Sequence, residues 1–358
     1  MPVELARRFA AIPLRYPLVA VALAAILVWP QGLSRWHLLW LVPVALPVAY
    51  IVHELGHLLA GFMVGLQVER IALGPLRIDR VGGRRRWHLS WNAWGGTIHS
   101  PDLLPGLRHR LLVSAAAGPL INLVVAFALA AAVALVHPGS LLAASCMTLS
   151  AASAGVGLMT LLPQPRVRFH SDGALMKVLF EGDAVGRRHV SLLRLSAWAQ
   201  EGYRPRDWST ELLEMVREPR DGSEAELAAH VYEIWHLMDT GETEEAARRV
   251  EESLDIARRV GGRFGRLAHA EAAFLAARDR KDAVGARAHR AEAGDLPASA
   301  ALRIEAAIRY AEGDAAGALA LIRQGIEETG LEDVFELDLL LDLQRRIREE
   351  QGASAGTG

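Results

Sequence analysis

The sequence is poor in cysteine and in lysine. Its 358 residues include one cysteine, Cys146, and two lysines, Lys177 and Lys281. A single cysteine excludes an intrachain disulfide and any metal site built from several cysteines. Nearly all positive charge is therefore carried by arginine, a bias typical of GC-rich bacterial genomes.

An excess of charge of one sign is also lacking. The formal net charge is -2, so nothing in the composition favours nucleic acid as a partner. Hydrophobic residues make up 51% of the chain and are concentrated in its first half, whereas charged residues gather in the second half. Two domains of different class are therefore expected.

Four apolar stretches predict membrane-spanning helices at residues 13–30, 36–66, 111–136 and 141–162. A helix needs about 20 residues to cross a bilayer core of about 30 Å. The first stretch is short, but no small-residue cleavage site follows it, so it is interpreted as a span and not as a signal peptide. The second is longer than a bilayer requires, and Pro43 and Pro47 are expected to break or bend it.

The distribution of arginine predicts the orientation of these spans. Arg7, Arg8 and Arg15 precede the first span, and a second group of arginines lies between residues 67 and 110. The connections on the opposite side hold only Arg35. Because positively charged loops stay in the cytoplasm, both termini are expected there, with the protein integral to a bacterial cytoplasmic membrane.

The connection between the second and third spans has the pattern of strands. Trp87, Leu89 and Trp91 alternate with polar residues after Gly82-Gly83, which indicates a β-hairpin with one apolar face. Tryptophan prefers the headgroup region, so we expect residues 67–98 to lie at the membrane interface and to contact lipid. An ordinary surface hairpin is the alternative.

The second half of the chain has the pattern of a soluble helical domain. Helical periodicity extends from about 223 to 350 and is interrupted at Gly241-Glu242, Arg280-Lys281 and Gly313-Asp314. Breaks at intervals of roughly 35 to 40 residues are typical of tetratricopeptide-like repeats, with an irregular helical bundle as the alternative. We therefore expect a membrane domain at 1–184, a helical linker at 185–222, a cytoplasmic repeat domain at 223–350 that binds a protein partner, and a disordered tail at 351–358.

A metal-binding motif lies within the second apolar stretch. His53 and His57 stand four residues apart, so on a helix both imidazoles reach one zinc ion, with Glu54 beside them as a base. Such a five-residue pattern also occurs by chance on solvated helix faces. Ionisable residues inside a span are costly, however, and this favours a functional site.

Three sequence segments together resemble the site-2 protease family. They are IVHELGHLLAGFMVGLQVERIALGPL with its Leu73-Gly74-Pro75 step, the AGPLIN segment that ends at Asn122, and LLPQPRVRFHSDG, which contains Asp172. The resemblance covers roughly residues 36–180. It implies an intramembrane zinc metalloprotease with one zinc ion per chain, with Asp172 as third ligand beside His53 and His57, and with Glu54 as general base. It also implies a transmembrane helix of a regulatory membrane protein as substrate.

Two positions depart from the family pattern. Thr160 stands where the family has asparagine before Leu-Leu-Pro, and the interval from Pro163 to Asp172 is longer than the common form. The departures leave alternatives open: Ser171 or Asp172 caps a helix, with zinc completed by His170 or by water. Asn122 and Thr160 are candidates for substrate contact or for a structural hydrogen bond.

The predicted fold class is an all-α multi-pass membrane protein with about four transmembrane helices and an interfacial hairpin, followed by a soluble helical-repeat domain. The predicted function is hydrolysis of peptide bonds in or near a transmembrane segment. The alternative is a non-catalytic membrane scaffold with a structural metal site. A transporter is a third reading, since polar residues in spans also line pathways, but internal transmembrane repeats are not evident.

Overall fold

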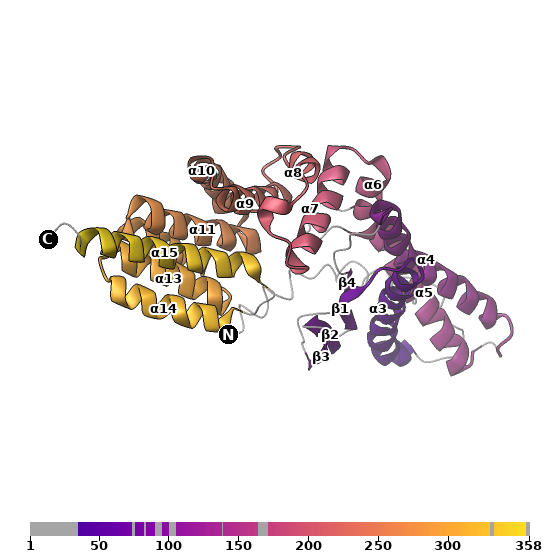
Figure 1. The fold of residues 1–358 in the computed structure, drawn as a ribbon. Helices are drawn as coiled ribbons and strands as arrows, with labels where there is room; N and C mark the ends of the chain where they lie inside the picture. Colours follow the sequence, from indigo (N-terminus) through magenta and orange to yellow (C-terminus); the bar gives the residue numbers. More distant parts are fainter. Residues whose placement is uncertain are drawn as a thin grey trace. The chain divides into compact units, whose positions relative to one another are not determined.

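The protein is described by a computed structural model that covers residues 35–73, 76–81, 84–89, 95–99, 105–137, 139–163, 171–329 and 333–355. The chain divides into two compact units, Met1–Gly182 and Asp183–Gly358 (Figure 1). Each unit is described separately below.

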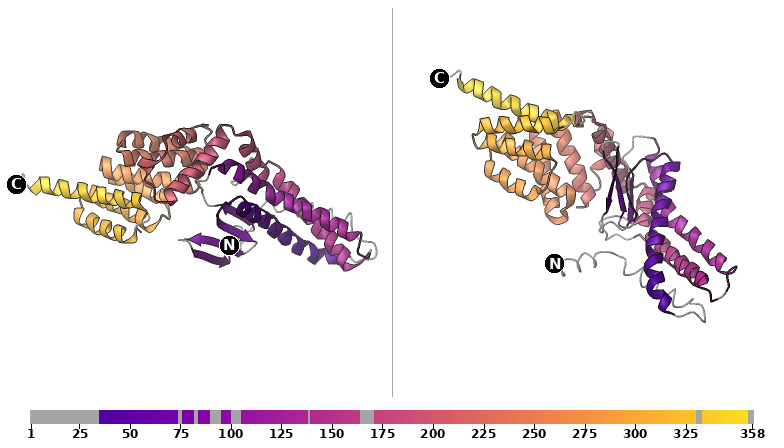
Figure 2. Two further views of the ribbon diagram at one scale, coloured as in Figure 1. Left: turned by 45° about the vertical axis from the view of Figure 1, so that its right-hand side comes forward. Right: turned by 90° about the horizontal axis from the view of Figure 1, so that it is seen from below.

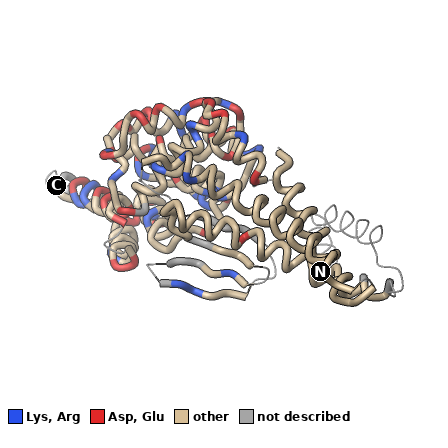
Figure 3. Tube along the Cα trace, turned by 90° about the vertical axis from the view of Figure 1, so that its right-hand side faces the viewer, with Lys and Arg blue, Asp and Glu red and all other residues tan. Residues whose placement is uncertain are grey.

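Three long apolar helices form the body of the first unit. They are α3 (Leu38–Met63), which follows the short helix η1 (Arg35–His37), α4 (Leu107–Val133) and α5 (Leu141–Leu161). All three pack on one another and, within the described residues, are the helices long and apolar enough to cross a membrane. Few of their residues are charged (Figure 3). These helices correspond to the second, third and fourth predicted spans, whereas the first, at 13–30, lies outside the described residues.

Helix α3 continues through both of its prolines. Pro43 and Pro47 lie inside the helix, so neither ends it, although each removes a backbone donor. The residues around them pack against α5 in a small core of Val42, Ala45, Leu46, Ala49, Ala152 and Val156. Of the two effects expected at these prolines, a break or a bend, the break is therefore absent from the helix that carries His53 and His57.

The connection between α3 and α4 forms a four-stranded antiparallel sheet. Its strands are β1 (Val68–Leu73), β2 (Leu76–Val81), β3 (Arg84–Leu89) and β4 (Gly95–His99), in the order β3-β2-β1-β4. The sheet contacts α3 through β1 and β4 (Figure 2).

The single hairpin predicted from the sequence is thus too small. It corresponds to β2 and β3, where Trp87 lies opposite Ile78 and Leu89 opposite Leu76. Strand β4 is short and begins with two glycines, so it carries little side-chain pattern and is defined by its pairing with β1. Trp91 and Gly82-Gly83 lie outside the described residues.

The second unit begins with helices that share a core. These are α7 (Ala184–Gln200), η2 (Pro205–Asp207), α8 (Thr210–Val216) and α9 (Glu224–Thr240). Leu195, Trp208, Leu213, Val216 and Tyr232 are buried together among them. Residues 185–222, expected to form a helical linker, therefore pack onto the helix that follows them.

The remaining helices alternate in a regular packing pattern. They are α10 (Thr243–Val260), α11 (Gly262–Arg280), α12 (Ala283–Ala293), α13 (Ala298–Ala311), α14 (Ala315–Glu328) and α15 (Val334–Ala355). Helices α9, α11, α13 and α15 pack in succession, and each even-numbered helix from α10 to α14 packs against the helices on either side of it in the chain. The three breaks predicted from the sequence are confirmed: α9, α11 and α13 end at Thr240, Arg280 and Ala311.

A buried ionic cluster joins α11, α13 and α15. Arg303 is 1% exposed and binds Glu271 at 3.1 Å and Glu336 at 2.8 Å. Its guanidinium also lies 4.2 Å from the ring centroid of Phe274. Paired charges of this kind are costly to bury and cost more when one partner is removed, so loss of one partner should destabilise the packing of the three helices.

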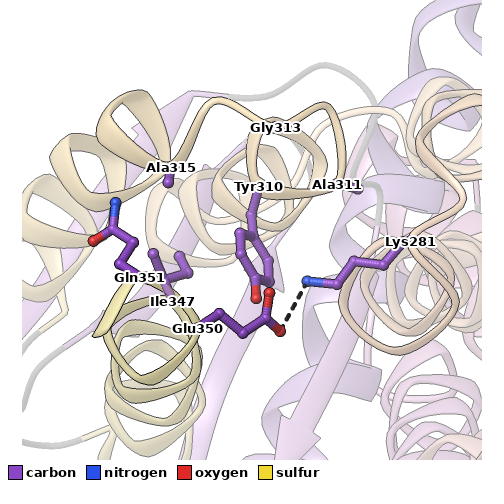
Figure 4. A pocket seen from close by; sticks show the side chains of 8 residues that line it. All are labelled: Lys281, Tyr310, Ala311, Gly313, Ala315, Ile347, Glu350 and Gln351. Atoms are coloured by element: carbon purple, nitrogen blue, oxygen red, sulfur yellow. Dashed lines mark hydrogen bonds and ion pairs between the residues drawn. The ribbon is translucent and has the colours of Figure 1, made fainter. Parts of the chain in front are cut away.

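The same unit has an open pocket of about 500 Å³ beside α13 and α15 (Figure 4). Lys281 lies over the ring of Tyr310, 3.1 Å from its centroid, and pairs with Glu350 at 3.4 Å. The charged groups lining this pocket therefore interact with one another.

Candidate metal centre

Helix α3 presents His53 and His57 one turn apart on the same face. Both side chains are buried, and their ring centroids lie 4.7 Å apart with the planes nearly perpendicular. The two Nε2 atoms are 3.1 Å apart. The four-residue spacing that suggested a shared metal ion therefore brings the two Nε2 atoms close enough to bind one ion.

The carboxylate of Asp172 completes the cluster. Its Oδ2 lies 3.0 Å from Nε2 of His53, and its Oδ1 lies 3.3 Å from Nε2 of His57. Among the described residues, His53, His57 and Asp172 form the one group of three or more histidine, cysteine, aspartate or glutamate side chains whose ligand atoms all lie within 4.8 Å of one another.

Asp172 is delivered by a short helix, α6 (Asp172–Glu181). Ser171 is its N-cap, and the Ser171 hydroxyl accepts from the backbone N–H of Ala174 and donates to the carbonyl of Leu162. The cap therefore uses Ser171 and leaves the Asp172 carboxylate directed at the histidines. A Cβ added at Gly173 would lie 1.8 Å from the carbonyl oxygen of Leu161, so glycine permits this close approach to α5.

The far end of α6 is held by α4. Arg108 donates from Nε to the carbonyl of Leu179 at 2.5 Å and from its terminal nitrogen to the carbonyl of Phe180 at 2.7 Å. The last carbonyls of a helix have no partner within the helix, so a side chain from outside that binds them fixes its end.

Small residues make room for the imidazoles. A Cβ at Gly118 would lie 2.4 Å from Nε2 of His57 and 2.9 Å from Cε1 of His53. A Cβ at Gly56 would lie 2.8 Å from the carbonyl oxygen of Ala117. Helices α3 and α4 can therefore approach closely at the cluster because both positions lack a side chain.

Each histidine has a second partner at its other ring nitrogen. Nδ1 of His57 lies 2.8 Å from the carbonyl oxygen of Ser114, and Nδ1 of His53 lies 3.3 Å from Nδ2 of Asn122. Both partners are on α4. Contacts of this type fix ring orientation at metal sites.

The donor set fits zinc in chemistry and in spacing. Two imidazoles and one carboxylate are a set used by catalytic zinc sites, which leave a fourth position open. Zinc–ligand bonds of about 2.0–2.2 Å in tetrahedral geometry place ligand atoms about 3.3–3.5 Å apart. The separations of 3.0, 3.1 and 3.3 Å lie close to this range.

The carboxyl group of Asp172 is acidic for a buried group. Burial alone would raise the pKa of its carboxyl group, but hydrogen bonds from His53 and His57 outweigh burial and lower the pKa to about 2. The carboxylate is therefore ionised at neutral pH, as metal coordination requires.

Glu54, Thr160 and His170 are the other residues that the sequence singled out. Glu54 follows His53 on α3 and is buried. The hydroxyl of Thr160 donates to the carbonyl of Gly157 in its own helix at 3.3 Å, so this hydrogen bond is local to α5. His170 lies outside the described residues.

Sequence reasoning missed Ser114, Gly118 as a space requirement, and Arg108 as an anchor of α6. The small residues of the AGPLIN segment were the available signal for Gly118. Nδ1 of His57 contacts the backbone oxygen of Ser114, and a backbone oxygen carries no signal in the residue type.

Comparison with known proteins gives one match. The model of peptidase family M50 matches residues 42–322. The match covers more than half of the chain, so the chain belongs to peptidase family M50, the family of the site-2 proteases, which are membrane metalloproteases. It includes the residues of the cluster and extends into the second unit. Neither the comparison with curated proteins nor that with solved structures gives a match.

Proposed function

We propose that the chain is an intramembrane zinc endopeptidase with His53, His57 and Asp172 as zinc ligands and Glu54 as general base. The convergence of the three ligand atoms within 4.8 Å, in a unit of three apolar helices, is the observation that carries this proposal. Family membership supports metalloprotease chemistry of this kind.

The zinc ion and Glu54 have separate chemical roles in this proposal. A bound zinc ion supplies a Lewis acid that activates water and polarises the scissile carbonyl. The Glu54 carboxylate takes a proton from the attacking water and delivers it to the leaving amide nitrogen. Glu54 is buried on α3 and directly follows His53 in the chain, which supports this role.

The proposed substrate is a transmembrane segment of a membrane protein with a regulatory role. A helix pairs all of its amides internally, so the segment must open before its bonds can be attacked. Strands β3 and β4 are the edges of the sheet, and β4 contacts α3. An opened segment that adds as a further strand at β4 would be held beside the helix that carries the histidines.

The second unit is proposed to recruit a protein partner or the cytoplasmic part of the substrate. Its helices pack in alternating succession, as in helical-repeat proteins, whose stacked repeats offer extended binding surfaces. Successive starts of α9, α11, α13 and α15 lie roughly 36 to 38 residues apart, near the period of tetratricopeptide-like repeats.

Glu54→Gln and Asp172→Ala separate catalysis from metal binding. The glutamine variant should keep zinc and lose activity by about 10²- to 10⁴-fold, because it removes only proton transfer. The aspartate variant should lose zinc and activity together. Zinc content by elemental analysis and cleavage of a membrane-embedded substrate by the purified protein measure both quantities.

His170→Ala is the matched control, since His170 is the other candidate ligand from the sequence and stands two residues before Asp172. It should keep both zinc and activity. Full turnover by the Glu54→Gln variant would support the alternative of a scaffold with a structural metal site. Retention of zinc by Asp172→Ala, together with its loss from His170→Ala, would transfer the third ligand to His170.

A further inference from the structure

Asn122 occupies an unusual position for an amide in a membrane helix. It is 0% exposed, and its Nδ2 lies 3.3 Å from Nδ1 of His53. Its Oδ1 is buried and has no hydrogen-bond partner among the described residues. A buried acceptor without a partner costs free energy, so the arrangement calls for an explanation.

Which ring nitrogen of each histidine carries the proton is relevant to the orientation of the Asn122 amide. A histidine binds a metal through a ring nitrogen that carries no proton, while the other nitrogen donates to a neighbouring acceptor. For His57 the arrangement is fixed, because Nδ1 faces the carbonyl oxygen of Ser114 at 2.8 Å and a carbonyl only accepts. When His57 binds a metal as a neutral ring, its proton therefore lies on Nδ1, and Nε2 is unprotonated and directed at the cluster.

For His53, the ring nitrogen that carries the proton depends on which atom of the Asn122 amide faces Nδ1. The oxygen and nitrogen of an amide exchange places on a half-turn of the side chain, and their assignment follows from the partners. With the nitrogen toward His53, Nδ1 must accept, and the proton moves to Nε2, where it blocks metal binding. With the oxygen toward His53, Oδ1 gains a partner, Nδ1 donates, and Nε2 is left with a free lone pair.

We infer that Asn122 is a positioning residue whose amide oxygen accepts from Nδ1–H of His53 and holds that ring in its metal-binding tautomer. The inference rests on the proposed zinc site. Direct contact with substrate is disfavoured because Asn122 is fully buried and because a Cβ at Gly157 of α5 would lie 3.2 Å from the Cβ of Asn122. Helix α5 thus packs directly against this residue.

The test compares Asn122→Leu, Asn122→Ala and Asn122→Asp in the full chain carrying Glu54→Gln. Zinc affinity is measured by chelator competition, the ligand field by the absorption of bound Co²⁺, and folding by thermal unfolding in detergent. The leucine and alanine variants should bind zinc about 10- to 100-fold more weakly, because the acceptor is lost. Asn122→Asp should bind zinc nearly as tightly as the parent, since a carboxylate accepts the same hydrogen bond.

A role confined to helix packing predicts the reverse order. Leucine would then preserve zinc affinity, while aspartate would place an unpaired charge in the interior and be the most damaging change. That result would overturn the inference. Ser153→Ala is the control, because Ser153 is equally buried in α5 and has no part in the cluster; it should leave zinc affinity unchanged.

His53→Ala separates the two proposals. If this variant loses zinc while Asn122→Leu and Asn122→Ala do not, the zinc site stands and the role of Asn122 is wrong. If His53→Ala retains zinc, the site itself is wrong, and the inference about Asn122 falls with it.

Discussion

Glycine at position 118 is required by the volume of two imidazoles. Gly118→Ala would place a methyl group 2.4 Å from Nε2 of His57, which forces the ring or the helix to move. A displacement of about 1 Å at a catalytic centre can cost about 10²-fold in rate. We therefore expect the variant to lose most of its activity and to bind zinc more weakly, as measured by chelator competition.

Ala126→Val provides the comparison for Gly118→Ala. Ala126 is a buried residue of the same helix, two turns further along, so the larger side chain overpacks the interior away from the histidines. It should lower the temperature of unfolding and leave zinc affinity intact. Equal loss of zinc in both variants would show that the effect of Gly118→Ala comes from general packing.

Individual residues differ in how far the sequence predicts them. The spacing of His53 and His57 suffices to bring their rings together, because four residues make about one helical turn. Asp172 comes from another part of the chain, and the spacing alone left open that it caps a helix, with His170 or water completing the zinc site. The hydrogen-bond partners on α4 depend on how α3 and α4 align, which no local pattern encodes.

Helix α6 depends on contacts at both ends to hold Asp172. Arg108→Ala would remove two hydrogen bonds to the carbonyls of Leu179 and Phe180. Hydrogen bonds from charged groups contribute about 1.5–3 kcal/mol each, and less where water reaches them, so the helix end should become mobile. We expect faster amide hydrogen exchange in residues 172–182 and weaker zinc binding than in the parent.

His109→Ala is the control for Arg108, since His109 is the exposed neighbour on the same helix. It should leave both the exchange rates and zinc affinity unchanged. Unchanged exchange in Arg108→Ala would mean that Ser171 and the contact at Gly173 suffice to hold the helix.

At the scale of elements, the long helices were predictable from the sequence, whereas the full set of paired strands was not. The spans and the breaks of the second unit follow from apolar length and from residues such as Gly241 and Gly313, both of which have positive φ. The sheet was predicted only as a hairpin, because β1 and β4 are joined by pairing between distant segments. Of the break or bend expected at Pro43 and Pro47, the break does not occur, and packing of α3 against α5 helps to offset the donors lost there.

The second unit contains an acid-sensitive contact. Burial raises the pKa of Asp239, but hydrogen bonds from Arg204 and Arg206 outweigh it and hold the pKa below its ordinary value. A lowered pKa means that the ionised carboxylate stabilises the folded state. This contribution is complete above the unfolded value of about 3.9 and is lost as the pH falls toward the folded pKa.

Asp239→Asn tests this linkage. The variant should be less stable than the parent at pH 7, and its unfolding temperature should fall less between about pH 5 and pH 3, since the titrating group is gone. Thermal unfolding of the detergent-solubilised protein, followed by circular dichroism, gives both curves. Asp207→Asn, at an exposed position nearby, should follow the parent. Parallel curves for the parent and Asp239→Asn would contradict the expected coupling.

For the whole molecule, the distribution of arginine predicts which parts face the cytoplasm. Charged loops of this kind are retained on the cytoplasmic side, so the sheet and the second unit should share that side with both termini. Single cysteines introduced as Arg85→Cys and Thr240→Cys in a Cys146→Ala background place one label on an exposed residue of each part. Neither should react with an impermeant reagent in intact cells, and both should react in inverted vesicles.

A cysteine at His137, in the connection between α4 and α5, should show the opposite pattern. Labelling of position 85 or 240 from outside the cell would contradict this arrangement of the spans, and with it the expected access of the second unit to a cytoplasmic partner.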